Sequence, residues 1–193
     1  MEMHCILQPS QILSAPLHVF SYKGPSRGGS THLLEAILER SADPNSRTPT
    51  GNTALSYAAM YGLVDYIPLL LRWGASLDVR KHVDGYTHLL DAVRHCHAGA
   101  VKALMENGAD YSVKSSRGET ILHTCARNAD WATMDVLAEA GMSDLDLDAR
   151  DGHGMTAAYC FAARRGKTVD LDLSMEALYA SIRKDNVGQT LLS

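Results

Sequence analysis

The sequence predicts an all-α fold in which helix-turn-helix repeats stack into a solenoid. Three segments begin and end with a glycine, and the two glycines are always 23 residues apart: Gly51–Gly74, Gly85–Gly108 and Gly118–Gly141. The leading glycines lie 34 and 33 residues apart. A fixed period near 33 residues that contains two helix-length stretches is typical of a solenoid, because each unit must stack on the next to bury its apolar side chains.

Residues 48–81 form the most regular repeat and define the expected unit. A turn at Gly51 leads to Thr53, whose side chain can cap the first helix by accepting a hydrogen bond from the backbone. A break at Gly62 separates this helix from a second, aliphatic helix that ends at Gly74. The same order of turn, cap and two helices recurs in the following segments, so the sequence predicts a row of helix pairs.

These segments resemble the ankyrin repeat, whose pattern is a turn glycine, Thr-Pro-Leu-His, a pair of alanines, a break, an aliphatic helix and Gly-Ala-Asp. Gly108-Ala109-Asp110 reproduces the end of that pattern, and residues 146–154 resemble the connector into a following repeat. The resemblance covers most of the chain and implies an ankyrin-type solenoid. The matched positions of the most regular repeat are Gly51, Thr53, Leu55, Ala58, Ala59, Gly62, Leu70, Leu71, Gly74 and Ala75.

We expect one ankyrin-repeat domain over residues 12–193, preceded by a loose N-terminal extension, residues 1–11. The domain should contain about five repeats, of which the first and the last are irregular. An aborted sixth repeat is expected at residues 185–193, because Gly188 follows Gly154 by 34 residues. The expected repeats are residues 12–47, 48–81, 82–114, 115–150 and 151–184.

Stacking of the repeats should bury aliphatic side chains in rows that run along the array. Of the two tryptophans, Trp131 is expected in the core, whereas Trp73, beside the glycine that ends its helix, is expected to be partly exposed. The expected rows are Leu55, Leu89 and Leu122 from the first helices, and Leu70, Leu104 and Leu137 from the second helices.

Composition and charge exclude several classes of protein. A net charge of -4 gives no general attraction to nucleic acid, so no nucleic-acid partner is expected. The four cysteines form no CxxC pair, which favours reduced thiols in an intracellular protein, cytoplasmic or nuclear. The N-terminus lacks the basic and apolar order of a signal peptide, and no membrane span is expected.

The resemblance also implies where a partner binds. In the ankyrin family, partners usually bind the concave face, which consists of the turn tips and the outward positions of the first helices. Carried over position by position, this arrangement gives a set of candidate residues for binding a protein or peptide. The candidates are Met60, Tyr61, Asp84, Tyr86, Arg94, His95, Arg117, Glu119, Arg127, Asn128, His153 and Arg164.

Three of these candidates form a series of arginines. Arg94, Arg127 and Arg164 occupy equivalent or adjacent positions of three successive repeats, which stack about 10 Å apart. Guanidinium groups suit carboxylates and phosphates. We therefore hypothesise a cationic stripe that binds an acidic or phosphorylated peptide, flanked by Tyr61 and Tyr86 as anchors. The alternative is that these arginines are ordinary solvated surface residues.

Two other functions stay open. One is an atypical enzyme with a small-molecule pocket on the concave face, in which His95, Tyr61, Tyr86 or Asp84 acts as an acid–base group. The other is a purely structural segment of a longer array. No motif indicates a catalytic residue or a cofactor.

No metal site is expected either. The residues His95, Cys96 and His97 are adjacent at a helix end, so their side chains point in different directions and do not easily converge on a zinc ion. His123 matches the repeated histidine of the ankyrin pattern. This resemblance implies a structural role in bonding a turn rather than a role as a catalytic base.

Overall fold

The structure is a computed structural model that describes residues 31–164 and 169–190, and for the last helix the side chains of residues 172–184. Within these residues the predicted all-α fold is confirmed: no strand is present, and only an isolated bridge joins Arg150 and Thr156. The helices are α3 (Thr31–Glu39), α4 (Ala54–Tyr61), α5 (Tyr66–Arg72), α6 (His88–Arg94), α7 (Ala98–Glu106), α8 (Ile121–Asn128), α9 (Trp131–Glu139), α10 (Ala157–Ala162) and α11 (Val169–Thr190).

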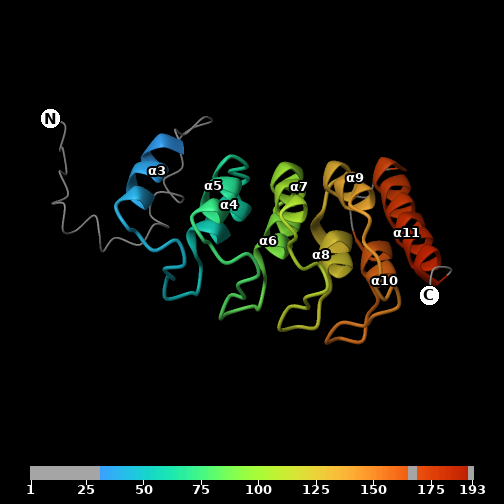
Figure 1. The fold of residues 1–193 in the computed structure, drawn as a ribbon. Coiled ribbons are helices and arrows are strands. Elements are labelled where there is room, and N and C mark those ends of the chain that lie inside the picture. Colours follow the sequence, from blue (N-terminus) through green and yellow to red (C-terminus); the bar gives the residue numbers. More distant parts are fainter. Residues whose placement is uncertain (1–30, 165–168, 191–193) are drawn as a thin grey trace, which may run out of the picture.

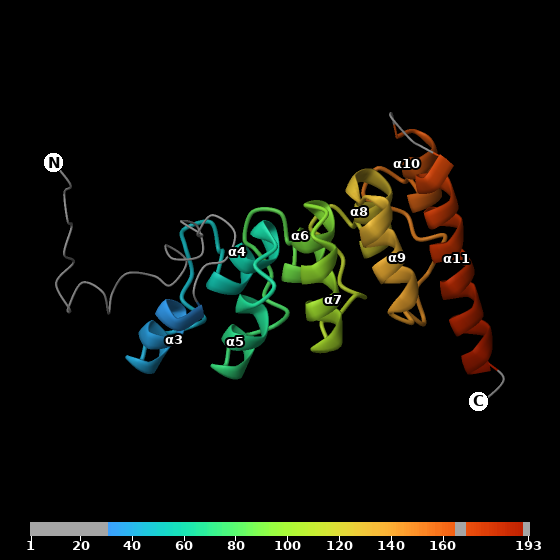
Figure 2. The same ribbon diagram turned by 90° about the horizontal axis from the view of Figure 1, so that it is seen from above.

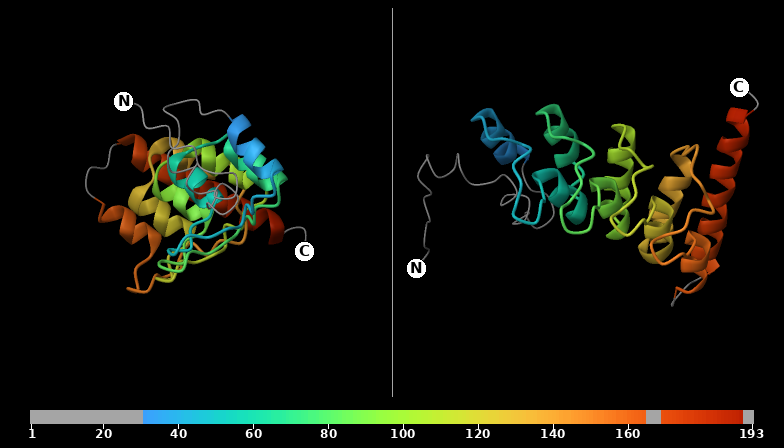
Figure 3. Two further views of the ribbon diagram at one scale, coloured as in Figure 1. Left: turned by 90° about the vertical axis from the view of Figure 1, so that its left-hand side faces the viewer. Right: turned by 90° about the horizontal axis from the view of Figure 1, so that it is seen from below.

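The helices form two layers that run the length of the molecule (Figures 1 and 2). The first helices of the repeats, α4, α6, α8 and α10, pack on one another in order, and the second helices, α3, α5, α7, α9 and α11, do the same. The turns between successive repeats project together to one side of the helices (Figures 1 and 3). This is the predicted solenoid, in which each repeat packs on its neighbours.

Capping explains why each first helix begins where it does. Each one follows a threonine in extended conformation, whose hydroxyl accepts a hydrogen bond from the backbone N–H three residues further on. The cap predicted at Thr53 is confirmed, and Ser56 completes it by accepting from the Thr53 N–H. The four capping residues are Thr53, Thr87, Thr120 and Thr156.

Both predicted leucine rows are confirmed, since all six side chains are at most 1% exposed. The prediction for Trp131 is wrong: its side chain is 58% exposed. Trp131 is the first residue of α9, and the buried positions of that turn are filled by Thr133 and Met134. Trp73 is 37% exposed, as expected.

The C-terminal end differs from the prediction. Helix α11 has 22 residues, so residues 185–190 continue this helix and do not begin a sixth repeat. Helices α5, α7 and α9 are followed by a glycine with positive φ, at Gly74, Gly108 and Gly141, and α3 is followed by Ser41 with positive φ, whereas α11 has no glycine before Gly188. Helix α11 packs along α9, and the Ser181 hydroxyl donates a 2.7 Å hydrogen bond to the Ala138 carbonyl.

Several expectations lie outside the described residues. The extension 1–11 and the first half of the first repeat belong to this group, and the boundaries of the five repeats stay predictions. The second helix of the first repeat is present as α3. Among the described residues, no helix combines the length and the apolar character that crossing a membrane requires.

Candidate protein-interaction surface

The candidate surface consists of the turns between repeats and the outward positions of α4, α6, α8 and α10, and we call it the concave surface. Its turns are hydrogen-bonded to one another. The Ser116 N–H donates to the Asp84 carbonyl at 2.9 Å, and the Gly152 N–H donates to the Arg117 carbonyl at 2.7 Å. A Cβ atom on Gly85 would lie 2.7 Å from the Ser116 nitrogen. The turns are therefore held close together in a fixed register.

Histidine side chains also hold the turns. The His123 Nε2–H donates a 2.8 Å hydrogen bond to the Met155 carbonyl in the next turn, while Nδ1 lies 2.8 Å from the Thr120 hydroxyl. The interpretation of His123 as a turn-bonding residue is confirmed. His88, fully buried, bonds in the opposite direction, to the hydroxyl of Thr53 in the preceding repeat. Burial lowers the pKa of His88 to about 4, so it is neutral at physiological pH.

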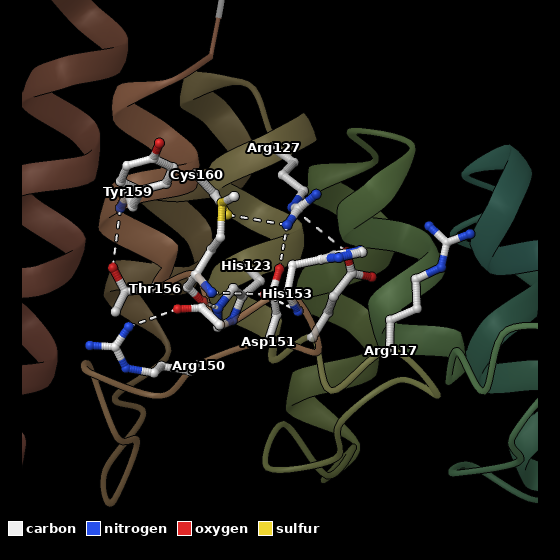
Figure 4. A network of polar contacts seen from close by, with 12 residues as sticks. Arg117, His123, Arg127, Arg150, Asp151, His153, Thr156, Tyr159 and Cys160 are labelled. Atoms are coloured by element: carbon white, nitrogen blue, oxygen red, sulfur yellow. Dashed lines mark hydrogen bonds and ion pairs between the residues drawn. The ribbon is translucent and has the colours of Figure 1, made fainter.

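A buried polar network connects the third, fourth and fifth repeats. The Tyr86 hydroxyl donates a 2.7 Å hydrogen bond to Glu119, whose other oxygen lies 3.6 Å from the Arg127 Nε. A second nitrogen of Arg127 lies 2.5 Å from Asp151 and 3.2 Å from the Cys160 sulfur (Figure 4). Three groups, Glu119 of the fourth repeat and Asp151 and Cys160 of the fifth, thus share one guanidinium.

The ionisation of this network follows from its partners. Burial raises the pKa of Asp151, but the backbone N–H groups of Met155 and His153, together with Arg127, outweigh burial and hold that pKa below its usual value. Burial, and next the hydrogen bond to Glu119, raise the pKa of Tyr86 to about 12. Tyr86 therefore keeps its proton and remains the donor in its bond to Glu119.

The predicted arginine stripe has a different character in the structure. Arg94 stacks on the Tyr86 ring at 5.2 Å from the ring centre and lies 3.5 Å from Asp84. Arg127 is likewise balanced by two carboxylates. Of the three arginines, Arg164 alone has purely neutral partners among the described residues, since it donates to the backbone carbonyls of Ala129 at 2.7 Å and Asn128 at 3.3 Å. The three arginines do not form a continuous cationic ladder.

Two of the candidates are not accessible. Tyr86 is 7% exposed and Glu119 is 4% exposed, because each is held by the other beneath Arg94 and Arg127. The repeat register predicts where the backbone of each residue lies, but not which neighbour its side chain binds. Tyr86 therefore cannot serve as the surface anchor that we hypothesised.

The remaining candidates stay at the surface to different degrees. Arg117 is exposed and, within the described residues, its guanidinium has no ion pair or hydrogen bond (Figure 4). Asp84 is half-buried between Arg94 and its own turn. The other candidates at the surface are Tyr61, Arg94, His95, Arg127 and His153, which are exposed, and Met60, Asn128 and Arg164, which are half-buried.

A small hollow of about 190 Å³ lies on the concave surface between α8 and α10. It combines two guanidiniums with apolar side chains and a thiol. The two arginines were expected on this surface from the sequence, whereas Cys160, which belongs to the irregular fifth repeat, was not among the candidates for it. The lining residues are Arg127, Met155, Cys160, Ala163 and Arg164.

The histidines near α6 do not form a metal-binding group. The rings of His95 and His97 stack with centres 6.4 Å apart, and His97 bonds the Met60 carbonyl through Nε2. The Cys96 thiol donates to the Asn128 carbonyl at 3.1 Å. In the part of the chain that the structure describes, no group of three His, Cys, Asp or Glu side chains is placed to hold a metal ion.

Comparison with known proteins agrees with this geometry. A family model described as ankyrin repeats (3 copies) matches residues 17–115. Protein PhlB of Serratia liquefaciens is 37% identical over 94 residues, which are 49% of this chain and 41% of that protein. Ankyrin repeat domain-containing protein SAT10 of Stachybotrys chartarum is 35% identical over 97 residues, which are 50% of this chain and 5% of that protein.

A human relative extends over more of the chain. SH3 and multiple ankyrin repeat domains protein 2 of Homo sapiens is 30% identical over 121 residues, which are 62% of this chain and 6% of that protein. In all three comparisons the chain spans less than half the length of the curated relative that it matches.

Proposed function

Because this chain belongs to the ankyrin-repeat family, whose repeats generally act as protein-interaction modules, we propose that it binds an acidic segment of a partner protein. The proposed site is the concave surface of the fourth and fifth repeats. It comprises the hollow between α8 and α10 and the neighbouring turn that carries Arg117.

The observation that carries this proposal is the presence of cations that have no carboxylate partner among the described residues. Arg164 lines the hollow, and within the described part of the chain its guanidinium donates to backbone carbonyls and forms no ion pair. Arg117 projects from the adjacent turn and forms no ion pair among the described residues. Separate carboxylates or phosphates of a partner segment can bind these two guanidiniums without displacing an internal acid.

Apolar groups beside these charges support a peptide rather than a free anion. Met155 is 38% exposed and lines the same hollow as Arg164. Binding sites of this kind combine apolar contact area with a few polar groups that fix orientation. At the other end of the concave surface, Arg94 is already paired with Asp84, so the second and third repeats offer less free positive charge.

The test is a peptide selection followed by charge-matched variants. Peptides selected from a random library against the whole chain are compared with copies in which each Glu or Asp becomes Gln or Asn, and with copies that carry phosphoserine instead. We expect acidic residues to be enriched, and the neutral copies to bind about tenfold more weakly. The phosphoserine copies distinguish a preference for phosphate from one for carboxylate.

Variants of the protein complete the test. Arg117→Glu should weaken binding of the acidic peptides and leave the fold intact, because this exposed side chain forms no ion pair or hydrogen bond among the described residues. Lys102→Glu reverses a charge on α7, in the other helix layer, and serves as the matched control. Equal affinity for acidic and neutral peptides, or an Arg117→Glu protein that binds like the control, would overturn the proposal.

A further inference from the structure

The face of the fifth repeat that points away from the fourth is uncovered in the described structure. In the preceding repeats, Leu122 and His123 occupy the positions of the first helix that the next repeat covers, and both are buried. The equivalent residues of α10 are Ala158 and Tyr159. Ala158 is exposed, and Tyr159 is 58% exposed. The last described repeat thus presents a face that is built like a stacking face.

A cleft of about 690 Å³ lies on this face between α10 and α11, at the end of the array where α11 is the outermost helix (Figure 2). Its apolar contributions come from both helices, and charged side chains of α11 surround them. The lining residues are Ala158, Phe161, Asp172, Met175, Glu176, Tyr179 and Arg183. A cleft of this size accommodates side chains of another helix.

The charged residues of α11 have an order along the helix. Glu176, Tyr179 and Arg183 fall on one side of the helix, because their spacings are close to one and two turns. Glu176 lies about one turn before Tyr179, and Arg183 lies about one turn after it. Glu176 and Arg183 are therefore separated by about 10.5 Å along the helix axis.

We propose that this face binds a second copy of the same chain, through α11 packed antiparallel on α11 of the other copy. Such a contact is symmetric about a two-fold axis, so the surface must complement itself. With the axis beside Tyr179, Glu176 of each copy faces Arg183 of the other. The side chains of the second α11 then fill the cleft against Ala158.

This surface is separate from the concave surface, so the inference does not depend on the proposed function. The order of charges is what selects a second copy. Because Glu176 and Arg183 lie on opposite sides of Tyr179, an antiparallel second copy of α11 brings each glutamate opposite an arginine. A parallel copy would instead place like charges opposite each other. The half-buried Tyr179 ring adds apolar contact area to the same stripe.

Sedimentation equilibrium of the whole chain over a range of concentrations tests the proposal. The wild type should associate to a dimer. Glu176→Arg places two arginine pairs across the axis and should raise the dissociation constant of the dimer about tenfold or more. The double variant Glu176→Arg/Arg183→Glu exchanges the charges on both copies and should restore association.

Two further variants separate a lost contact from a damaged fold. Ala158→Arg places a charged side chain in the cleft at an exposed position, and it should also weaken the dimer. Glu39→Arg, on α3 at the other end of the array, is the matched control and should associate like the wild type. Circular dichroism must show unchanged helix content in every variant.

A wild-type chain that stays monomeric at all concentrations overturns the proposal, because the face would then belong to another partner. The proposal also fails if Glu176→Arg dimerises as well as the wild type, or if the double variant associates no better than Glu176→Arg alone.

Discussion

The substitution Asp151→Asn probes the polar network that connects the last three repeats. The Asp151 side chain is 1% exposed and accepts hydrogen bonds from the N–H groups of His153 and Met155 as well as from Arg127. Asparagine keeps one oxygen for the backbone bonds. Its amide group, however, faces the Arg127 guanidinium, so two donors meet and the charge of Arg127 loses its closest partner.

The size of the effect follows from the burial of the two groups. Removing one partner from a fully buried ion pair costs about 3–5 kcal/mol. Here the Arg127 side chain is 37% exposed and keeps Glu119 at 3.6 Å, so solvent and the second carboxylate reduce the loss. We expect the free energy of unfolding to fall by about 1.5 kcal/mol, which lowers Tm by about 3–6 °C in a chain of this length.

Thermal and urea unfolding, followed by circular dichroism, measure this change. The matched control is Asp148→Asn, which removes an exposed carboxylate from the same connector and should leave the free energy of unfolding nearly unchanged. The pKa of Asp151 is lowered in the folded state, so its contribution is present above about pH 4 and is lost as the pH falls through the folded-state pKa. The difference between wild type and Asp151→Asn should therefore shrink in acid.

The reasoning about the network is refuted if Asp151→Asn is as stable as the Asp148→Asn control at neutral pH. It is also refuted if the difference between wild type and variant grows, rather than shrinks, as the pH is lowered below about 4.

Three other predictions concern stability. The pKa of His88 is about 4 in the folded state and about 6.5 in the unfolded state, so the free energy of unfolding of the wild type should fall by up to about 3 kcal/mol as the pH is lowered from 6.5 to 4. His88→Gln should lose less over the same range in urea unfolding, and equal losses would contradict this. Gly85→Ala and Gly108→Ala each place alanine at a positive φ, which should cost about 1 kcal/mol of the free energy of unfolding. Gly85→Ala should cost clearly more, because its Cβ would also meet Ser116. Similar urea unfolding midpoints for the two variants would be evidence against this packing. Trp131→Ala should cost under about 1 kcal/mol by thermal unfolding, whereas about 3–5 kcal/mol would indicate a core residue.

The repeat register and the core could be predicted from the sequence because both depend on local signals. Thr53 caps a helix through its own backbone neighbours, and Leu55 is buried by the equivalent part of the next repeat. A period near 33 residues therefore determines which positions repeat and which of them face inward. The resemblance to the ankyrin pattern implied the structural role of His123, which its hydrogen bond to the next turn confirms.

The partners of the arginines could not be predicted in this way. Arg127 binds Asp151, which lies 24 residues further on, and shares Glu119 with the Tyr86 hydroxyl. These contacts depend on how the side chains of three repeats meet, and the position of a residue within its repeat does not determine them. The signal in the sequence is an acidic residue directly after the turn glycine, as in Gly118–Glu119, which could have suggested that Glu119 is a buried partner of an arginine.

The C-terminal helix shows a second limit of the repeat pattern. Gly188 lies at the right distance from Gly154 for a new repeat, but a glycine in phase does not end a helix unless the backbone leaves the helical conformation there. Helix α11 packs along α9 and continues through Gly188 to Thr190. The uncovered face between α10 and α11 follows from this difference.

The central claim is that the fourth and fifth repeats bind an acidic segment on the concave surface. The most direct test is an NMR titration of the isotope-labelled chain with the selected acidic peptide, which follows the backbone amide signal of each residue. We predict that shifts concentrate around Arg117, Met155 and Arg164, and that the neutral copy of the peptide produces none at the same concentration. Shifts confined to other repeats or to α11, or equal shifts with the neutral copy, would contradict the claim.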